Sequence, residues 1–375
     1  MSENHPHVLI LPYPAQGHML PLLDFTHQLV NNGVAITILV TPKNLPILDH
    51  LLSRNPSIKT LVLPFPSHPS IPAGVENVKD LPASGFRSMM YNLGKLRDPI
   101  LEWFRNHPSP PSTIISDMLL GFTHEIATQL GIRRVWSVGP VLPPGEDDVS
   151  GQSNRGGSSS VLTSEILAWL DKCEDHSVVY VCFGSQAVLT NKQMEELAIA
   201  LDKSGVKFIL SAKRALKGHA SNDYGVIPSW FEEKVAGRGL VVRDWSPQVL
   251  ILKHQAIGAF LTHCGWNSTL ESLIAGVPML TWPMGADQFA NANLLVDEHE
   301  VAIRACEGAQ TVPNSDELAK LLAEAVQGNN VEERRLRASE LRKVAINGIK
   351  EGGNSFKDLA AFVKHLREEA TKIEV

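Results

Sequence analysis

Residues 245 to 288 read WSPQVLILKHQAIGAFLTHCGWNSTLESLIAGVPMLTWPMGADQ, and this stretch decides the fold of the surrounding chain. The apolar run Ile257–Thr262 predicts a buried strand, and residues 267–275 predict a helix. Residues 263–266 therefore form a tight turn from strand to helix. Such a turn directs backbone N–H groups and the positive end of the helix dipole at an anion. The stretch thus predicts a parallel α/β unit with an anion site beside the strand.

The side chains around this turn suit the separate parts of a UDP-sugar. Asn267 and Ser268 open the helix, where they can cap it and donate to a phosphate. His263 ends the strand, within reach of a diphosphate. Glu271 lies one helical turn after Asn267, where its carboxylate can accept from both hydroxyls of a ribose. Trp245 offers a flat face for a base.

The rest of the chain alternates short apolar strands with helical stretches, which predicts βαβ units with parallel sheets. Residues 143–160, PPGEDDVSGQSNRGGSSS, have no apolar periodicity and predict a flexible linker. We therefore expect a first domain over residues 1–142, a second over 161–354 and a last helical segment over 355–375. The strands are expected at 7–11, 35–40, 58–63, 113–116, 178–183, 207–211 and 239–242, and the helices at 20–31, 45–54, 191–203 and 355–367.

Three polar residues follow predicted strands, where the ligand crevice of a parallel sheet lies. His18 stands in the loop LPYPAQGHMLP, just before the helix expected near Leu20; a surface or capping role is the alternative to a catalytic one. Asp117 follows the strand at 113–116 and could orient an imidazole, or could cap the next helix. Ser185, in the turn after the strand at 178–183, is expected to touch a diphosphate.

Taken together, the ordered residues of 245–288 closely resemble the donor-binding segment of plant family 1 UDP-glycosyltransferases, the secondary-product glucosyltransferases. Stretches such as TPKNLPIL and WPMGADQFANANLLVDE resemble most nearly the subgroup with flavonol and hydroxybenzoate glycosyltransferases. The resemblance implies a GT-B fold, in which two Rossmann-like domains bind the acceptor on the first and the donor on the second. It also implies that the last helix packs back on the first domain.

The resemblance assigns a role to each candidate residue. His18 would be the general base and Asp117 its orienting carboxylate. In the donor site Trp245 would stack on uracil; Gln248 and Glu271 would contact the ribose; His263, Gly265, Trp266, Asn267, Ser268 and Ser185 would surround the diphosphate; Trp282, Asp287 and Gln288 would face the sugar. Gln288 in the last position resembles glucose users, whereas galactose users often carry His there.

The reaction so implied is inverting transfer of a sugar, expected to be glucose, to a hydroxyl or carboxyl of a small aromatic plant metabolite such as a flavonoid or hydroxybenzoate. UDP-glucose or a related UDP-sugar would be the co-substrate, with no further cofactor. No DxD pair suited to a metal ion stands at a strand end, and Asp147 with Asp148 lies in the predicted linker as a solvated pair.

One departure from the family concerns length. Ser185 follows Asp117 by 68 residues, where the family has well over a hundred. The segment IATQLGIRR runs directly into VWSVGP, so we expect the missing segment of the family to be lost near residues 133–138, on the acceptor side. This loss predicts a narrower first sheet. A UDP-sugar-binding but non-catalytic isoform is therefore the alternative to an active enzyme. A nicotinamide-dependent oxidoreductase is disfavoured, because neither PYPAQGH nor GSQAV is a GxGxxG fingerprint.

The composition limits the classes of protein to which the chain can belong. With 43% hydrophobic residues, 20% charged residues and a net charge of −6, the chain predicts a globular enzyme and argues against nucleic acid as a partner. No apolar run approaches the roughly 18 residues of a membrane span, and the start has no basic and apolar leader. We expect a cytoplasmic monomer. Cys173, Cys182, Cys264 and Cys306 have no CxxC spacing and are expected to be buried thiols, neither disulfides nor metal ligands.

Overall fold

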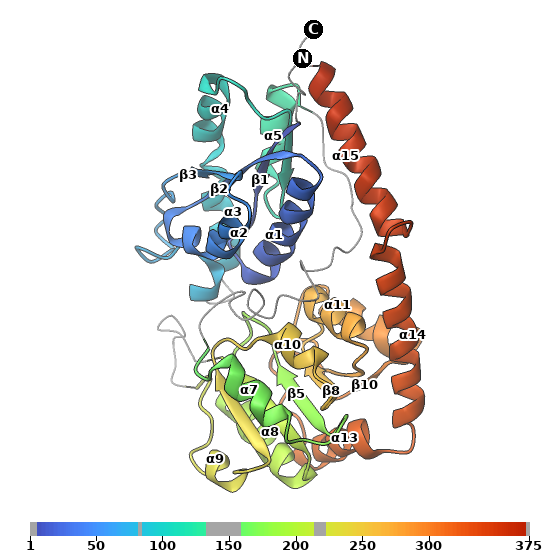
Figure 1. Cartoon of the computed structure of the whole chain (residues 1–375). Coiled ribbons are helices and arrows are strands. Elements are labelled where there is room, and N and C mark those ends of the chain that lie inside the picture. Colours follow the sequence, from blue (N-terminus) through green and yellow to red (C-terminus); the bar gives the residue numbers. More distant parts are fainter. Residues whose placement is uncertain (1–5, 82–84, 133–158, 214–222, 373–375) are drawn as a thin grey trace. The chain divides into compact units, whose positions relative to one another are not determined.

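The computed structural model of the chain describes residues 6–81, 85–132, 159–213 and 223–372 (Figure 1). The chain divides into two compact units, Met1–Asp148 with Gly348–Val375 as unit 1 and Val149–Asn347 as unit 2. Each unit holds one parallel sheet with helices, which confirms the predicted α/β class. All but the last two residues of the expected linker, and the expected joint at 133–138, lie outside the described residues.

The sheet of unit 1 has the order β3-β2-β1-β4, and every neighbouring pair in it is parallel. Its strands are β1 (His7–Leu11), β2 (Ala35–Val40), β3 (Lys59–Val62) and β4 (Thr113–Ser116). The inner residues of β1 and β2 are buried in unbroken runs, as expected for strands covered on both faces. The predicted bounds are confirmed for three strands, and β3 is one residue shorter at each end.

Eight helical segments accompany this sheet among the described residues: α1 (Gln16–Asn31), η1 (Pro42–Leu48), α2 (Asp49–Arg54), η2 (Val78–Asp80), α3 (Phe86–Gly94), α4 (Arg97–Asn106), α5 (Phe122–Gln129) and α15 (Asn354–Lys372). Two predictions need correction. Helix α1 starts four residues before Leu20, so His18 lies in its first turn and not in a loop. The helix expected over 45–54 divides into a 3₁₀ segment and α2, because Pro46 has no N–H to donate to the carbonyl four residues earlier.

Helix α15 closes the core of unit 1 from the far end of the sequence. Leu359, Phe362, Val363 and Leu366 are buried in one cluster with apolar residues of β1, β2 and α1. The Phe362 ring lies 5.9 Å from that of Phe25 in α1, and Arg367 donates to the carbonyl of Asn32 over 3.0 Å. Unit 1 is therefore built from both ends of the chain.

The sheet of unit 2 has six parallel strands in the order β10-β9-β8-β5-β6-β7. They are β5 (Val178–Cys182), β6 (Lys207–Ala212), β7 (Gly239–Arg243), β8 (Ile257–Thr262), β9 (Met279–Thr281) and β10 (Ala302–Arg304). The strand predicted at 257–262 is confirmed to the residue, and the three predicted at 178–183, 207–211 and 239–242 agree within one residue; β9 and β10 were not predicted. The helices are α7 (Thr163–Leu170), α8 (Asn191–Ser204), α9 (Phe231–Lys234), α10 (Gln248–Lys253), α11 (Trp266–Ala275), α12 (Gln288–Asn293), the π-helical η4 (Leu294–Glu298), α13 (Ser315–Gln327) and α14 (Val331–Ile349).

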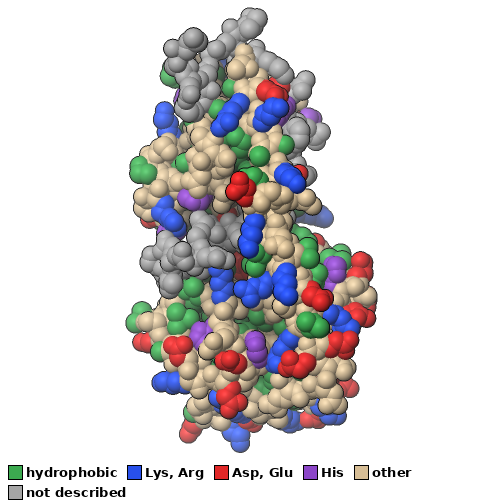
Figure 2. Space-filling view, turned by 45° about the vertical axis from the view of Figure 1, so that its right-hand side comes forward, with side chains coloured by type: hydrophobic (Ala, Val, Ile, Leu, Met, Phe, Trp, Pro, Cys, Tyr) green, Lys and Arg blue, Asp and Glu red, His purple; other side chains and the backbone are tan. Residues whose placement is uncertain are grey.

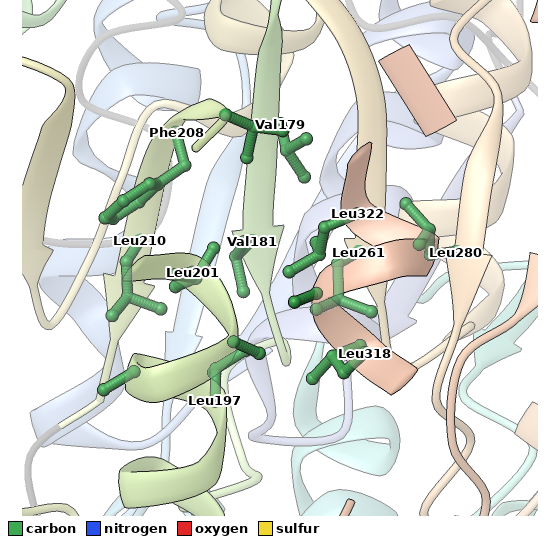
Figure 3. Packing of buried hydrophobic residues seen from close by; sticks show 14 of the residues in the cluster. Val179, Val181, Leu197, Leu201, Phe208, Leu210, Leu261, Leu280, Leu318 and Leu322 are labelled. Atoms are coloured by element: carbon green, nitrogen blue, oxygen red, sulfur yellow. The ribbon is translucent and has the colours of Figure 1, made fainter. Parts of the chain in front are cut away.

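Helices α8 and α13 cover one face of this sheet. Leu197 and Leu201 of α8 and Leu318 and Leu322 of α13 pack on buried strand residues such as Val181 (Figure 3). The start of α8 is fixed by a capping box, in which Thr190 and Gln193 each accept from the other's backbone N–H, and its end by Gly205 at φ 69°. The layer formed by α8 and α13 thus packs against the strands of this sheet.

Each sheet has one point at which the strand order reverses. In unit 1 the chain adds β2 on one side of β1 and later β4 on the other, and in unit 2 it adds β6 on one side of β5 and later β8 on the other. The helices that follow two such neighbouring strands leave in opposite directions, which opens a crevice at the carboxyl ends of that pair. A ligand site is therefore expected at the loops after β1 and β4, and another at the loops after β5 and β8.

Three further expectations concern the surface and the thiols. All four cysteines are free, but only Cys182 and Cys264 are buried; the expectation of burial is wrong for Cys173 and Cys306, which are half-buried. Acidic and basic side chains share the same face in Figure 2, in keeping with the modest net charge. No helix within the described ranges is both long and apolar enough to cross a membrane.

The packing of α15 gives a first prediction. Replacing Phe362 by Ala should lower the free energy of unfolding of unit 1 by about 3–5 kcal/mol, because a buried ring is lost and a cavity remains. Lys364→Ala is the matched control on the same helix, since that side chain is 79% exposed. Urea unfolding of both variants checks this. Equal midpoints would show that α15 contributes little to unit 1.

Candidate functional site

The structure brings His18 and Asp117 together at the reversal point of unit 1. His18 follows β1 and Asp117 follows β4, and the imidazole Nδ1 lies 2.8 Å from Oδ2 of the carboxylate. The His18 side chain is 28% exposed and that of Asp117 only 10%. Because an ionised carboxylate only accepts, the hydrogen in this contact is carried by Nδ1. In the neutral ring, Nε2 is then the nitrogen that can take up a proton.

Asp117 does not cap the next helix, which was the alternative for it. Helix α5 begins at Phe122, after Gly121, and no side chain caps it. The second carboxylate oxygen of Asp117 accepts from the backbone N–H of Leu119 over 2.9 Å instead. This bond fixes the carboxylate plane, so that Oδ2 is held toward His18.

Tyr13 lies beneath His18 and was not singled out in the sequence. Its ring meets the imidazole edge-on with centroids 5.5 Å apart, and its hydroxyl donates to the carbonyl of Phe86 over 3.3 Å. Burial, together with the nearby Asp117 carboxylate, raises the pKa of this phenol far above its usual range. The neutral Tyr13 side chain thus packs against the imidazole of His18.

In unit 2 the turn after β8 has the geometry of an anion site. Cys264 adopts a left-handed φ of 62°, and Gly265 is the N-cap of α11. The first intrahelical bond runs from Thr269 N to Gly265 O over 3.0 Å, so the N–H groups of 266–268 come before it. The helix starts one residue earlier than predicted, and no side chain caps it. The expectation that Asn267 and Ser268 cap the helix is therefore wrong.

His263 is held in this turn by two glycines. A β-carbon at position 184 would lie 2.6 Å from both Cε1 and Nε2 of the imidazole, and one at position 265 would lie 2.5 Å from Nε2. Gly184 follows β5 and Gly265 follows β8, so the ring lies at the reversal point of this sheet. Only glycine at both positions leaves room for the ring.

The charge state of His263 follows from its surroundings. Burial lowers its pKa to about 4, although Asp287 acts in the opposite direction. Its Nδ1 is buried and has no hydrogen-bond partner among the residues described. At neutral pH the imidazole is therefore an uncharged hydrogen-bonding group.

Ser185 belongs to the loop after β5 and directly follows Gly184. Lys213, just beyond the end of β6, donates from Nζ to the Ser185 carbonyl over 2.6 Å. This contact could not be predicted from sequence, because Lys213 stands outside the motifs. It adds a cation beside the loop that faces the His263 turn.

The residues predicted to hold the ribose form one hydrogen-bonded group. Gln248, the first residue of α10, donates from Nε2 to Oε2 of Glu271 over 2.7 Å and to Oγ of Ser268 over 3.0 Å. Trp245 precedes them and is half-buried. The structure thus joins the start of α10 to the first two turns of α11.

The residues predicted to face the sugar are placed unequally. Asp287 is exposed, and its Oδ2 accepts from Nδ2 of Asn291 over 2.8 Å; the same nitrogen donates to the carbonyl of Cys264 over 2.9 Å. Gln288 accepts at Oε1 from the backbone N–H groups of residues 284 and 285. Trp266, which was expected beside the diphosphate, is 47% exposed. Asn291, which sequence reasoning missed, therefore links Asp287 to the turn at Cys264.

Trp282 is not brought to the surface of this site. Its side chain is fully buried, lies edge-on to Phe183 with ring centroids 5.1 Å apart, and donates to the carbonyl of Gly308 over 3.4 Å. The indole is part of the core beneath the turn. The structure therefore offers a packing role for Trp282, in contrast to the sugar contact expected for it.

Within the described part of the chain, no group of three or more His, Cys, Asp or Glu side chains is arranged to hold a metal ion. The polar groups at the β5/β8 reversal point are instead N–H groups, amides, hydroxyls and the His263 ring. Groups of these kinds can stabilise an anion by hydrogen bonds.

Comparison with known proteins agrees with this geometry. The profile of the family described as UDP-glucoronosyl and UDP-glucosyl transferase matches residues 127–344. Flavonol 3-O-glucosyltransferase UGT89B1 of Arabidopsis thaliana is 43% identical over 463 aligned positions, which cover 96% of each chain. Flavonol 7-O-rhamnosyltransferase of the same plant is 38% identical, with 97% of this chain and 99% of the relative covered.

A solved structure gives the same result. The crystal structure of Arabidopsis thaliana UGT89C1 complexed with UDP-L-rhamnose superimposes with a TM-score of 0.88 at 37% identity, covering 97% of this chain and 99% of that one. The 463 aligned positions exceed the 375 residues of the chain, so the relatives carry internal sequence that it lacks. The expected shortening is thereby confirmed.

The glycines around His263 yield a prediction. Gly265→Ala should weaken UDP binding several-fold, because the new methyl group displaces the imidazole into a less favourable rotamer. Position 265 isolates this effect, since its φ of −59° suits alanine. Gly94→Ala is the control, because a β-carbon there meets nothing within 4 Å. Titration calorimetry checks both variants, and unchanged affinity in Gly265→Ala would refute the proposed crowding.

The low pKa of His263 leads to a prediction about stability. Between pH 6.5 and about 4 the unfolded chain takes up a proton at this residue and the folded chain does not. Stability should therefore fall as the pH drops through that window, by up to about 3 kcal/mol from this group. Urea unfolding at a series of pH values should show a shallower fall for His263→Gln. Parallel curves for the two proteins would contradict the burial of a neutral imidazole.

Proposed function

Because the chain belongs to the UDP-glucoronosyl and UDP-glucosyl transferase family, as a plant family 1 UDP-glycosyltransferase of a flavonol-related subgroup, we propose that this shortened form is itself active. It transfers glucose from UDP-glucose, with inversion, to a hydroxyl or carboxyl of a small aromatic metabolite such as a flavonoid or hydroxybenzoate. The observation that carries this proposal is the 2.8 Å bond between His18 and Asp117.

The base chemistry follows from that bond. Nε2 of His18 removes the proton of the acceptor hydroxyl as the oxygen attacks the anomeric carbon of the sugar. The imidazolium that forms is stabilised by the Asp117 carboxylate on Nδ1. Help of this kind is worth about 10²- to 10⁴-fold in rate. An acceptor that is already a carboxylate needs no such base, so phenolic hydroxyls should depend on His18 more strongly.

The donor is held by unit 2. The uracil stacks on Trp245, the ribose hydroxyls donate to Glu271, and the diphosphate receives the N–H groups at the start of α11. As the bond from the anomeric carbon to the diphosphate oxygen breaks, negative charge grows on the departing UDP. His263 adds a hydrogen bond to that charge, and a bound diphosphate raises the pKa of this imidazole above its value in the free protein.

Glucose is favoured by the sugar side of the site. Gln288 keeps its Nε2 group for a ligand because only its Oε1 bonds to described residues, and Asp287 is exposed to accept from sugar hydroxyls. The relative named as a flavonol 3-O-glucosyltransferase supports glucose. The relative named as a rhamnosyltransferase makes UDP-rhamnose the second donor to test.

The alternative is a chain that binds UDP-sugar without transferring it. Its motivation is the internal sequence that the relatives carry and this chain lacks, expected on the acceptor side. Both β1 and β4, which carry the base and its partner, are nonetheless present. This placement favours the active form.

The test is detection by mass spectrometry of a hexosylated product, after purified protein receives UDP-glucose and a panel of flavonols and hydroxybenzoates. His18→Ala should lower product formation from phenolic acceptors by at least about a hundredfold. UDP affinity should stay unchanged, since the donor residues are in unit 2. No product from folded, UDP-binding protein across the panel would favour the non-catalytic form, and equal activity in His18→Ala would refute its role as base.

A further inference from the structure

The loop that leads to His18 is bonded to a distant segment of unit 1. This loop, residues 12–15, joins the end of β1 to the start of α1. The backbone N–H of Val78 donates to the carbonyl of Pro14 over 2.9 Å. The Val78 side chain is buried and packs in one cluster with side chains of the loop. Residues 76–78, called the bracing segment below, thus contact the chain just before the first turn of α1.

Two buried amides hold the bracing segment in place. Asn44, which follows β2, donates from Nδ2 to the carbonyl of Glu76 and to Oγ1 of Thr41, each over 2.9 Å. Its Oδ1 accepts from Nδ2 of Asn77 over 2.7 Å. The Oδ1 of Asn77 in turn accepts from the backbone N–H of Lys79 over 3.0 Å. Both amide side chains are buried, so water does not compete for these bonds.

The orientation of both amides is set by backbone groups. A carbonyl only accepts, so Asn44 must present Nδ2 to Glu76, which leaves its Oδ1 for Asn77. A backbone N–H only donates, so Asn77 must present Oδ1 to Lys79, which leaves its Nδ2 for Asn44. Every bond in this group therefore has its own hydrogen. Because a buried amide without a partner costs free energy, the pair favours this one arrangement.

The two members of the base pair are anchored differently. The backbone N–H of Asp117 donates to the carbonyl of Leu11, so this carboxylate is fixed to the end of β1. His18 lies in the first turn of α1, and the N-cap of that helix, Ala15, makes no side-chain cap. The position of the imidazole therefore depends on the course of residues 12–15. A shift of that loop would move His18 relative to a carboxylate that stays in place.

We propose that Asn44 and Asn77 are positioning residues, which hold the bracing segment so that its bond to Pro14 keeps His18 against Asp117. This inference rests on the proposed function, in which His18 is the base. The two amides act through the loop and do not contact the reacting atoms. Their removal should therefore impair the base while leaving UDP affinity, which belongs to unit 2, unchanged.

The bond between the bracing segment and the loop can be removed by itself. Val78 is the first residue of η2, a position that tolerates proline, and the φ of −132° and ψ of 141° at Asn77 suit a residue before proline. Val78→Pro therefore deletes the N–H that bonds to Pro14 without breaking the local fold. Val78→Ala is the matched control, because it trims the same side chain and keeps the N–H.

Two measurements report on His18. The first is kcat with a phenolic acceptor, which should fall about tenfold in Val78→Pro because the base is misplaced, and should stay near wild type in Val78→Ala. In a His18→Ala background Val78→Pro should cause no further loss, since residues that act through one group are not additive. The second is a two-bond proton–nitrogen NMR spectrum of the neutral ring, assigned with His18→Gln. Wild type should carry the hydrogen on Nδ1, and Val78→Pro should show a mixture of both tautomers.

A second comparison tests the amide pair. Serine at position 77 can still accept from the Lys79 N–H but is too short to reach Asn44, so Asn77→Ser removes only the bond between the amides. It should move both measurements in the same direction as Val78→Pro. Asn55→Ala is the control, because that amide is also buried in unit 1 but precedes β3, at the opposite edge of the sheet. It should lower the melting temperature and leave the His18 ring unchanged.

Three results would overturn the inference. They are a wild-type tautomer in both Val78→Pro and Asn77→Ser, an equal change of the ring in Val78→Ala, and an equal change in Asn55→Ala. If Val78→Pro does not fold, Asn77→Ser decides alone against Asn55→Ala. The proposed function fails separately, through wild-type protein that binds UDP but forms no glycoside. In that case the NMR spectra still measure whether the bracing segment positions His18.

Discussion

The parallel pairing of β5 with β8 is the constraint on which the donor residues depend. Cys182 pairs with Thr262 at the carboxyl ends of these strands, so the turn at Gly184 and the turn at His263 leave the sheet side by side. The absence of a β-carbon at 184 and at 265 then lets the imidazole fit against both backbones. In unit 1 the pairing of Leu11 with Ser116 has the same effect, because it brings together two residues 99 positions apart. One topological rule thus positions both His18 and His263.

The contrast between these imidazoles follows from their neighbours. His18 has a carboxylate on one nitrogen and remains partly exposed, which suits a base that becomes charged during turnover. His263 is buried, with a pKa lowered to about 4, which suits a group that donates a hydrogen bond without bringing a full charge. The shortening of the chain leaves both arrangements in place. The joint expected at residues 133–138 follows α5 in the sequence. It therefore comes after β1 and β4, the strands that precede His18 and Asp117.

The sequence predicted those features that depend on local pattern. The strand at 257–262, the turn after it and the position of Asp117 directly after a strand could be read from the sequence, because apolar runs and strand ends are local signals. The start of α1 was missed because Pro14 and Gly17 are typical of loops, although Ala15 accepts the first helical bond from Met19. The division of residues 45–54 came from proline, whose missing N–H outweighed the apolar periodicity.

Contacts between distant elements could not be predicted in this way. Tyr180 lies in the run VVYVC, where an apolar pattern indicates burial but not the partner of a hydroxyl. Asn291 and Lys213 stand in no motif, and their bonds to the turn and to Ser185 depend on strand order. Trp282 shows the opposite error, since its place beside the donor motif suggested a ligand contact and the side chain packs in the core.

The bond pattern of Gln288 has a consequence for how donor preference can evolve. Its carbonyl oxygen accepts from two backbone N–H groups of the 284–285 turn, so the side chain proposed to contact the sugar also holds the loop. An exchange to histidine would replace the amide oxygen, which accepts both bonds, by a ring nitrogen that accepts one. Under the proposed function, a change of sugar preference at this position therefore also changes how the loop is held.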